Sequence, residues 1–258
     1  MLLCNLRLRF TPQARHARWL AVCCLLAVCA TAAHAQWRVA PALDPIGPGI
    51  IAHIRTQSPV VALTFDLCQT QKPAGYDAKI VKILKDTHTP ATFFPCGRWL
   101  ETHRDVAQGL ASWPGFEVGN HSYIHPHLPR LDQDAIREQL QRTQDIAYSL
   151  TNKPPRVFRC PYGEYNADVL HVAATMGLHV IQWDVETGDP DPHTSADEIL
   201  RLVKQRTHPG SIIIMHANGR GWHSAEALPS VLEWIASKGW WCVTVSDLLK
   251  YGKPLPPE

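Results

Sequence analysis

Two histidines four positions apart are the sharpest chemical feature of the sequence. His121 and His125, in the segment HSYIH, lie where a predicted strand over residues 116–122 gives way to a turn, so both imidazoles can converge on one cation. Imidazole nitrogen binds Zn²⁺ at about 2.0–2.1 Å, and a catalytic site keeps an open position for water. Pro126 disfavours a helical conformation at His125, which makes this a loop site. The alternative is a pair of surface histidines, and we interpret His127 as a bystander.

Three more polar residues close apolar segments. Asp66 ends VVALTFD, where a buried carboxylate is costly without a partner; it could be a general base, a metal ligand or a helix cap. Arg159, in FRCPYG, can pair with Asp66 and keep it ionised and oriented. His216 ends SIIIMH and suits a general acid that protonates a leaving group. Taken singly, each could instead be a satisfied buried polar residue.

Strand-like and helix-like segments alternate from Pro59 onward and must position these residues. The predicted strands cover residues 60–66, 91–96, 116–122, 157–162, 179–185, 211–216 and 241–245. Helical patterns cover residues 76–87, 101–112, 132–150, 166–176, 199–205 and 226–237, with Ser195-x-x-Glu198 as a capping box. The alternation predicts an α/β fold with a parallel sheet. Seven short strands without a glycine-rich phosphate loop favour a closed barrel over an open, doubly wound sheet.

In a parallel α/β barrel the working residues lie at the C-terminal ends of the strands. The residues at the predicted ends are Asp66, Cys96, His121, Arg159, Asp184 and His216. An accidental set would hold fewer groups that bind metals or handle protons. The sequence therefore predicts a hydrolase whose site is built around a metal held by His121 and His125.

The first 35 residues have the layout of a secretory signal peptide. Four arginines precede an apolar run over residues 19–30, and Ala33-His34-Ala35 supplies the small residues of a cleavage site. The run is shorter than the roughly 20 residues that span a bilayer, and a permanent signal anchor is the alternative. We predict a signal peptide over 1–35, an extended lead-in over 36–58, a catalytic domain over 59–250 and a C-terminal tail over 251–258.

Cleavage after Ala35 changes both the charge and the cysteine count. The whole chain carries 25 basic and 23 acidic residues, a formal net charge of +2. Loss of the four arginines makes the net charge −2, so there is no electrostatic case for nucleic-acid binding. The cysteines that remain are Cys68, Cys96, Cys160 and Cys242. They could form disulfides in an oxidising compartment, and the sequence does not choose among three full pairings.

Five short motifs follow one another in a fixed order between about residues 59 and 249. They are Thr64-Phe65-Asp66, His121-Ser-x-x-His125-Pro, Arg159-x-Pro161-Tyr162-Gly163, Trp183-Asp184 through Asp189, and Ile214-x-His216. In this order they resemble the motifs of the polysaccharide deacetylases, the carbohydrate esterases of family 4 that share the NodB homology domain. The resemblance implies a distorted (β/α)7 barrel and metal-dependent removal of acetyl groups from sugars.

The resemblance also implies a role for each site residue. The implied roles are metal ligands for His121 and His125, general base for Asp66, orientation of Asp66 for Arg159, general acid for His216, tuning of His216 for Asp189, and an oxyanion-binding backbone N–H for Tyr162. The implied cofactor is a divalent metal, with zinc expected and cobalt or manganese also suited to imidazole and carboxylate.

Leu67 departs from the family pattern. The first motif of the family usually carries a second Asp here, which completes the metal site, and leucine cannot bind a cation. Asp66 itself, Asp77 or Cys68 could take that place, or the site could be weakened or metal-free. Cys68 could instead form a disulfide with Cys96 on the neighbouring strand.

We predict a periplasmic or secreted monomer that removes N-acetyl groups from an N-acetylglucosamine polymer, either peptidoglycan or a chitin-like chain. After cleavage of the signal we expect no membrane attachment. Two alternatives stay open: an O-acetyl esterase of plant polysaccharide, and a glycan-binding barrel that has lost catalysis. Pro190 stands where the family often has Trp, which would alter how the sugar is held. Trp222, in GRGWH, is the tryptophan best placed to stack on a sugar.

Overall fold

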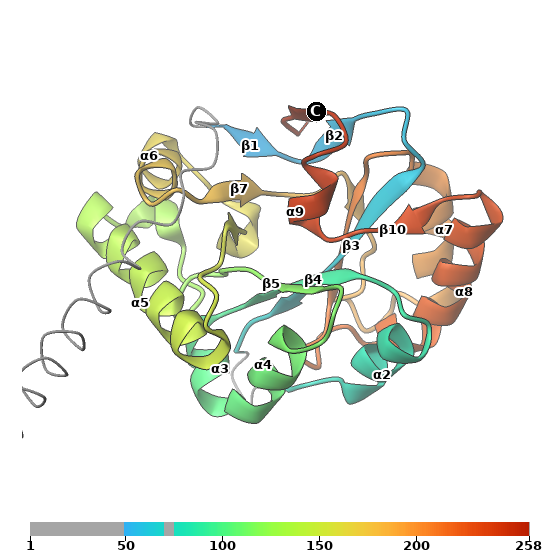
Figure 1. Cartoon of the computed structure of the whole chain (residues 1–258), viewed down its shortest axis with the longest axis horizontal. Helices are drawn as coiled ribbons and strands as arrows, with labels where there is room; N and C mark the ends of the chain where they lie inside the picture. The colour runs from blue at the N-terminus through green and yellow to red at the C-terminus, as the bar shows by residue number, and fades with distance from the viewer. Residues whose placement is uncertain (1–48, 70–74, 258) are drawn as a thin grey trace, which may run out of the picture. The chain divides into compact units, whose positions relative to one another are not determined.

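The computed structural model describes residues 49–69 and 75–257, and Figure 1 traces the chain. The described residues belong to one compact unit, residues 43–258. The predicted signal peptide and most of the predicted lead-in lie outside the described residues. Among the described residues no helix is both long and apolar enough to cross a bilayer.

Strand β3 (Val60–Leu67) is the centre of the sheet, and all eight of its residues are buried. It pairs in parallel with β4 (Ala91–Pro95) on one side and with β9 (Ile212–His216) on the other. The strand order is β5-β4-β3-β9-β8, with β5 at Phe116–Val118 and β8 at Val185–Glu186. β10 (Trp241–Cys242) pairs with the beginning of β3. A strand covered on both faces reads as a continuous apolar run, as β3 does.

A second ladder, in the order β1-β7-β6, contains β1 (Ile50–Ile51), β7 (His179–Ile181) and β6 (Val157–Phe158). An isolated parallel bridge between Asn120 and Phe158 links it to the larger sheet. In the described part of the chain the ladders do not close into one continuous ring. The architecture is a distorted (β/α)7 barrel of parallel strands, and the predicted fold class is confirmed.

The helices lie around the strands in Figure 1. Their bounds are α2 (Ala78–Asp86), α3 (Gly97–Thr102), α4 (Arg104–Ala111), α5 (Gln133–Thr151), α6 (Ala167–Thr175), α7 (Ala196–Arg206), α8 (Ser224–Ser237) and α9 (Val245–Leu248), with short 3₁₀ turns η3 (Leu128–Arg130) and η4 (Pro161–Gly163). The predicted capping position is confirmed, because the Ser195 hydroxyl accepts a hydrogen bond from the backbone N–H of Glu198. A side-chain cap of this kind helps to fix the residue at which α7 begins.

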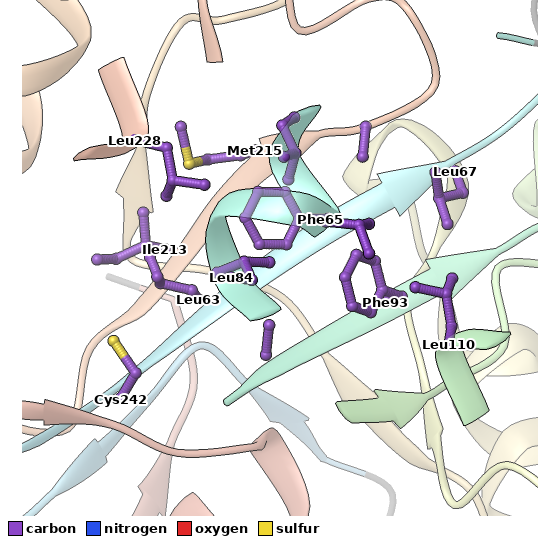
Figure 2. Close-up of a cluster of buried hydrophobic side chains, with 14 of the residues drawn as sticks. Leu63, Phe65, Leu67, Leu84, Phe93, Leu110, Ile213, Met215, Leu228 and Cys242 are labelled. Carbon is purple, nitrogen blue, oxygen red and sulfur yellow. The ribbon is translucent and has the colours of Figure 1, made fainter. Parts of the chain in front are cut away.

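Alternation along β3 separates the core from the interior of the barrel. Leu63, Phe65 and Leu67 point to the helix-covered side, where they pack with residues such as Leu84 and Leu228 (Figure 2). The intervening side chains point the other way, and Ala62 belongs to the cluster that fills the barrel. Because successive side chains of a strand face opposite sides, Asp66 lies on the barrel side and Leu67 on the helix side.

The lead-in and the tail meet in a small sheet of their own. β2 (His53–Arg55) pairs antiparallel with β11 (Lys253–Leu255), so residues on either side of the predicted catalytic domain are hydrogen-bonded to each other. A bridge from His53 to Ser211 places this pair at the start of β9, the end of the barrel opposite His216.

Candidate active site

A pocket opens at the carboxyl ends of the strands. Its walls include Asp66 at the end of β3, His216 at the end of β9, and His125, Tyr162 and Asp189 from the loops between them. In a parallel barrel these loops and strand ends meet on one face, which is why residues far apart in the sequence share the pocket.

Asp66 and Arg159 form the buried ion pair that the sequence predicts. Nη1 of Arg159 donates to Oδ1 of Asp66 at 2.9 Å, and Nη2 donates to the backbone carbonyl of Gln182 at 3.2 Å. Burial alone would raise the pKa of Asp66, but the charge of Arg159, with smaller contributions from His121 and His216, holds it below its ordinary value. Asp66 is therefore ionised at neutral pH.

His121 is held in one tautomer. Its Nδ1 lies 2.8 Å from the backbone carbonyl of Arg159, which can only accept, so Nδ1 carries the proton. Nε2 then presents a lone pair, 3.5 Å from Oδ2 of Asp66. Burial lowers the pKa of His121, so the imidazole is neutral at neutral pH. Two electron-pair donors thus face each other, an arrangement that suits a cation between them.

His125 completes the histidine pair. Its ring centroid lies 4.8 Å from that of His121, with the ring planes at 71°. Burial, and then the neighbouring His121, lower the pKa of His125 to about 3, so it is a neutral donor at ordinary pH. The backbone of Ser122 and His125 lies in the left-handed region, with φ of 62° and 59°. Such strain in non-glycine residues is concentrated at functional sites.

Two neutral imidazoles and Oδ2 of Asp66 are donors of the kinds that divalent cations bind. Among the described residues, no three His, Cys, Asp or Glu side chains are grouped so that they could hold a metal ion. Leu67 is buried in the apolar core. Asp77 caps α2 by accepting from the backbone N–H of Lys79 at 2.9 Å. The residues therefore offer two imidazoles and one carboxylate oxygen that is also available as a base.

Cys68 lines the same pocket as a thiol. Burial, with the charge of Asp66, raises its pKa to about 12, and Nδ2 of Asn218 donates to its Sγ at 3.0 Å. Cys96, Cys160 and Cys242 are also free and buried, so the hypothesised disulfide between Cys68 and Cys96 is not formed.

His216 is set up to hold a proton. Its Nδ1 lies 3.0 Å from Oδ1 of Asp189, and its backbone N–H donates to Oδ2 at 2.6 Å. Asp189 also accepts from the hydroxyls of Ser224 at 2.6 Å and Thr187 at 3.1 Å, which fixes its carboxylate. Burial lowers the pKa of His216, but the hydrogen bond and charge of Asp189 outweigh it, and the pKa is raised above 6.5.

Tyr162 brings a free backbone donor to the pocket. Its φ of 58° and ψ of 9° interrupt η4, and within the described residues its N–H has no acceptor. Its ring lies 4.4 Å from that of His125, with the planes at 73°. A free N–H beside a carboxylate and imidazoles is a means of stabilising negative charge on an acyl oxygen.

The model of the family described as polysaccharide deacetylase matches residues 53–181, half of the chain. The chain belongs to the polysaccharide deacetylase family. The peptidoglycan-N-acetylglucosamine deacetylase of Bacillus cereus is 33% identical over 196 residues, which cover 75% of this chain and 69% of that protein. The chitooligosaccharide deacetylase of Sinorhizobium fredii is 31% identical, covering 62% of this chain and 73% of that protein. The predicted enzyme class is thereby confirmed at the level of the family.

Solved structures with the same fold include both active and inactive proteins. A CE4 family pseudoenzyme from Bacillus anthracis is 30% identical, with a TM-score of 0.72 over 81% of this chain and 71% of that one. A mutant of that pseudoenzyme with restored enzymatic activity is 31% identical and has the same TM-score, over 81% of this chain and 74% of that one. The Bc1960 peptidoglycan N-acetylglucosamine deacetylase is 30% identical, with a TM-score of 0.73. The match covers 80% of this chain and 95% of that one.

Asp184 is not part of the site of this family member, and its prediction as a strand-end site residue is wrong. The predicted strand over 179–185 is interrupted after β7, and β8 begins only at Val185. Asp184 accepts from the backbone N–H of Ile212 at 2.7 Å and the hydroxyl of Ser211 at 2.8 Å, at the start of β9. It therefore lies at the opposite end of the barrel from His216.

The remaining predicted or neighbouring groups either hold the site residues in place or lie exposed where a ligand could contact them. The thiol of Cys96 donates to the backbone carbonyl of His121 at 3.2 Å, so it supports the histidine and does not reach the pocket. Thr187 and Ser224 fix Asp189 but carry no signal in the sequence, because hydroxyls of this kind recur throughout the chain. Trp222 is 58% exposed, which leaves its ring available to a ligand.

Proposed function

We propose that this protein is a metal-dependent hydrolase that removes N-acetyl groups from an N-acetylglucosamine polymer, peptidoglycan or a chitin-like chain. The observation that carries the proposal is the joint presence, in one pocket, of an ionised carboxylate and an imidazole with a raised pKa. A base and an acid with separated pKa values are what hydrolysis of an amide requires. The names of the relatives support the choice of substrate.

His121 and His125 would hold the metal, and Oδ2 of Asp66, 3.5 Å from Nε2 of His121, would lie beside it as the base. When bound, a divalent ion such as zinc lowers the pKa of a water ligand and polarises the acyl oxygen. Cobalt and manganese suit the same donors. The carbonyl of Arg159 keeps the Nε2 lone pair of His121 on the side that faces Asp66, and Asp66 stays ionised through its pair with Arg159.

Asp66 and His216 would divide the proton transfers between them. Oδ1 of Asp66 is occupied by Arg159, so Oδ2 accepts the proton of the attacking water. The water oxygen bonds to the acyl carbon, and the N–H of Tyr162 stabilises the oxyanion. His216, whose Nδ1 faces Asp189, protonates the sugar nitrogen from Nε2 as the carbon–nitrogen bond breaks. The products are acetate and a free amine.

A glycan-binding barrel without catalysis is the second candidate. It is favoured by Leu67, which removes a ligand of the family's metal site, and by the fold that this chain shares with a pseudoenzyme. An O-acetyl esterase remains the enzymatic alternative, since the bifunctional xylanase/xylan deacetylase of Cellvibrio japonicus matches 69% of this chain at 30% identity. The relatives named for peptidoglycan also support a periplasmic or secreted location.

Metal content and acetate release, measured on the same sample, test the proposal. The purified protein is dialysed against zinc, analysed for metal and incubated with chitooligosaccharides or peptidoglycan. We expect about one equivalent of zinc and release of acetate. Zinc retention below about a tenth of an equivalent together with no acetate would exclude the enzyme and leave the glycan-binding barrel. Acetate released only from acetylated xylan would select the esterase.

A further inference from the structure

The loop that carries His125 and the loop that carries Tyr162 are joined by a hydrogen bond beside the pocket. Nδ1 of His127 lies 2.7 Å from Oε2 of Glu164. His127 follows His125 by two residues, and Glu164 follows Tyr162 by two residues. The bond therefore connects the segment with a proposed metal ligand to the segment with the proposed oxyanion donor.

The same histidine also stacks on the ring of Tyr162. The centroids of His127 and Tyr162 are 4.2 Å apart, and the planes are within 13° of parallel. His125 contacts the same tyrosine ring at 73°. Tyr162 is 55% exposed, and its ring lies against the imidazoles of both His125 and His127. The bond from Glu164 fixes the orientation of His127, and His127 in turn fixes the tyrosine.

The backbones of the two connected loops both need such support. His125 and Tyr162 have φ of 59° and 58°, a region that non-glycine residues occupy only when their surroundings hold them there. The N–H of His125 donates to the hydroxyl of Ser122 at 3.2 Å, but the N–H of Tyr162 has no acceptor among the described residues. The N–H groups of Gly163 and Glu164 donate to the carbonyls of Cys160 and Pro161, each at 3.1 Å, and close the turn around Tyr162. Contacts of the tyrosine side chain add a further restraint on the direction of its N–H.

We propose that His127 and Glu164 are positioning residues that hold Tyr162 and His125 in their working geometry. The proposal rests on the proposed function, because it concerns the same oxyanion donor and imidazole. It revises the interpretation of His127 as a bystander. Neither residue reaches the reacting atoms, so their removal changes the placement of Tyr162 and leaves the acid and the base in place.

The chain offers a matched control in His223 and Glu226. Their Nδ1 and Oε2 atoms are 3.0 Å apart, and the His223 side chain is 38% exposed, as is that of His127. The control residues are three apart at the start of α8, so their bond joins no separate loops. Loss of this bond should leave turnover within about twofold of wild type.

The variants Glu164→Ala, Glu164→Gln and His127→Phe test the positioning in the metal-loaded full chain. We expect Glu164→Ala to lower kcat about tenfold with KM within about twofold, because misplacement of an oxyanion donor affects the transition state. Glu164→Gln keeps a hydrogen-bonding side chain, and His127→Phe keeps the stacking on Tyr162. Each of these variants should therefore lose less kcat than Glu164→Ala. An unchanged kcat in Glu164→Ala, or an equal loss in Glu226→Ala, would overturn the proposal.

A spectroscopic readout separates this proposal from the proposed function. With ring-labelled tyrosine, the NMR signal of Tyr162 is identified by its absence in Tyr162→Phe. We expect Glu164→Ala to shift that signal, because it frees His127 from its hydrogen bond, and Glu226→Ala to leave it in place. If wild type releases no acetate, the proposed function fails and the NMR comparison still decides the positioning. A Tyr162 signal unmoved by Glu164→Ala would contradict it.

Discussion

Asp66 and Leu67 are adjacent residues with opposite surroundings. The carboxylate lies in the pocket against Arg159, and the leucine is fully buried with Phe65 and Phe93 in the core shown in Figure 2. A strand can place only one of two successive side chains on a given face. Leu67 therefore contributes packing, while Asp66 is the proposed base and has its carboxylate 3.5 Å from Nε2 of His121.

Leu67→Ala separates packing from chemistry. The substitution removes buried methyl groups and leaves a cavity, so we expect the free energy of unfolding to fall by about 2–5 kcal/mol. Zinc affinity should stay within about threefold of wild type, because the leucine donates nothing to the site. Urea unfolding and zinc titration provide the two measurements. A large loss of zinc affinity in the folded variant would show that position 67 helps to shape the site.

Asp189→Asn tests the pKa of His216. A general acid must be protonated, so activity is lost as the pH rises through its pKa, which Asp189 raises above 6.5. Without the carboxylate, burial dominates and the pKa falls, so the alkaline limb of kcat/KM should move to lower pH. We expect the acid limb to follow the proposed base Asp66, whose pKa lies below its ordinary value, and to stay where it is. An unmoved alkaline limb would assign it to another group.

At the scale of elements, the apolar runs predict most of the strands but not where each one ends. The predicted strand over 116–122 is regular only over β5, and the stretch over 179–185 divides into β7 and β8. The break depends on distant partners: the carbonyl of Gln182 accepts from Arg159, and Asp184 binds the start of β9. Local sequence patterns carry no information on such contacts. The strand pattern therefore predicts the wrong end of the barrel for Asp184.

The pairing of β2 with β11 is also absent from any local pattern, because about two hundred residues separate the two strands in the chain. Deletion of residues 252–258 should lower the free energy of unfolding by about 1–3 kcal/mol, the value of a few backbone hydrogen bonds. The pair lies at the end of the barrel opposite the pocket, so kcat should not change. Urea unfolding and acetate release check both parts. A loss of turnover without a loss of stability would connect this end to the site.

At the scale of the whole molecule, the ordered motifs predict the family, the barrel and the residues that meet in its pocket. They do so because most of the motif residues lie at or just after the carboxyl end of a strand, and these ends of a parallel barrel share one face. The support of the site is less predictable. Thr187, Ser224 and Glu164 act through single hydrogen bonds that depend on how the loops are folded. Such contacts correspond to no regular spacing of residues that could be recognised in the sequence.

The central claim is that His121, His125 and Asp66 form one hydrolytic centre despite Leu67. Acetate release from chitooligosaccharides with zinc present, compared between wild type and His125→Ala, tests it most directly. The account predicts steady release by wild type and a loss of at least about a hundredfold in the folded variant, which also fails to retain zinc. Equal release by both proteins would contradict the account, because the histidine pair would then not be the site of the reaction.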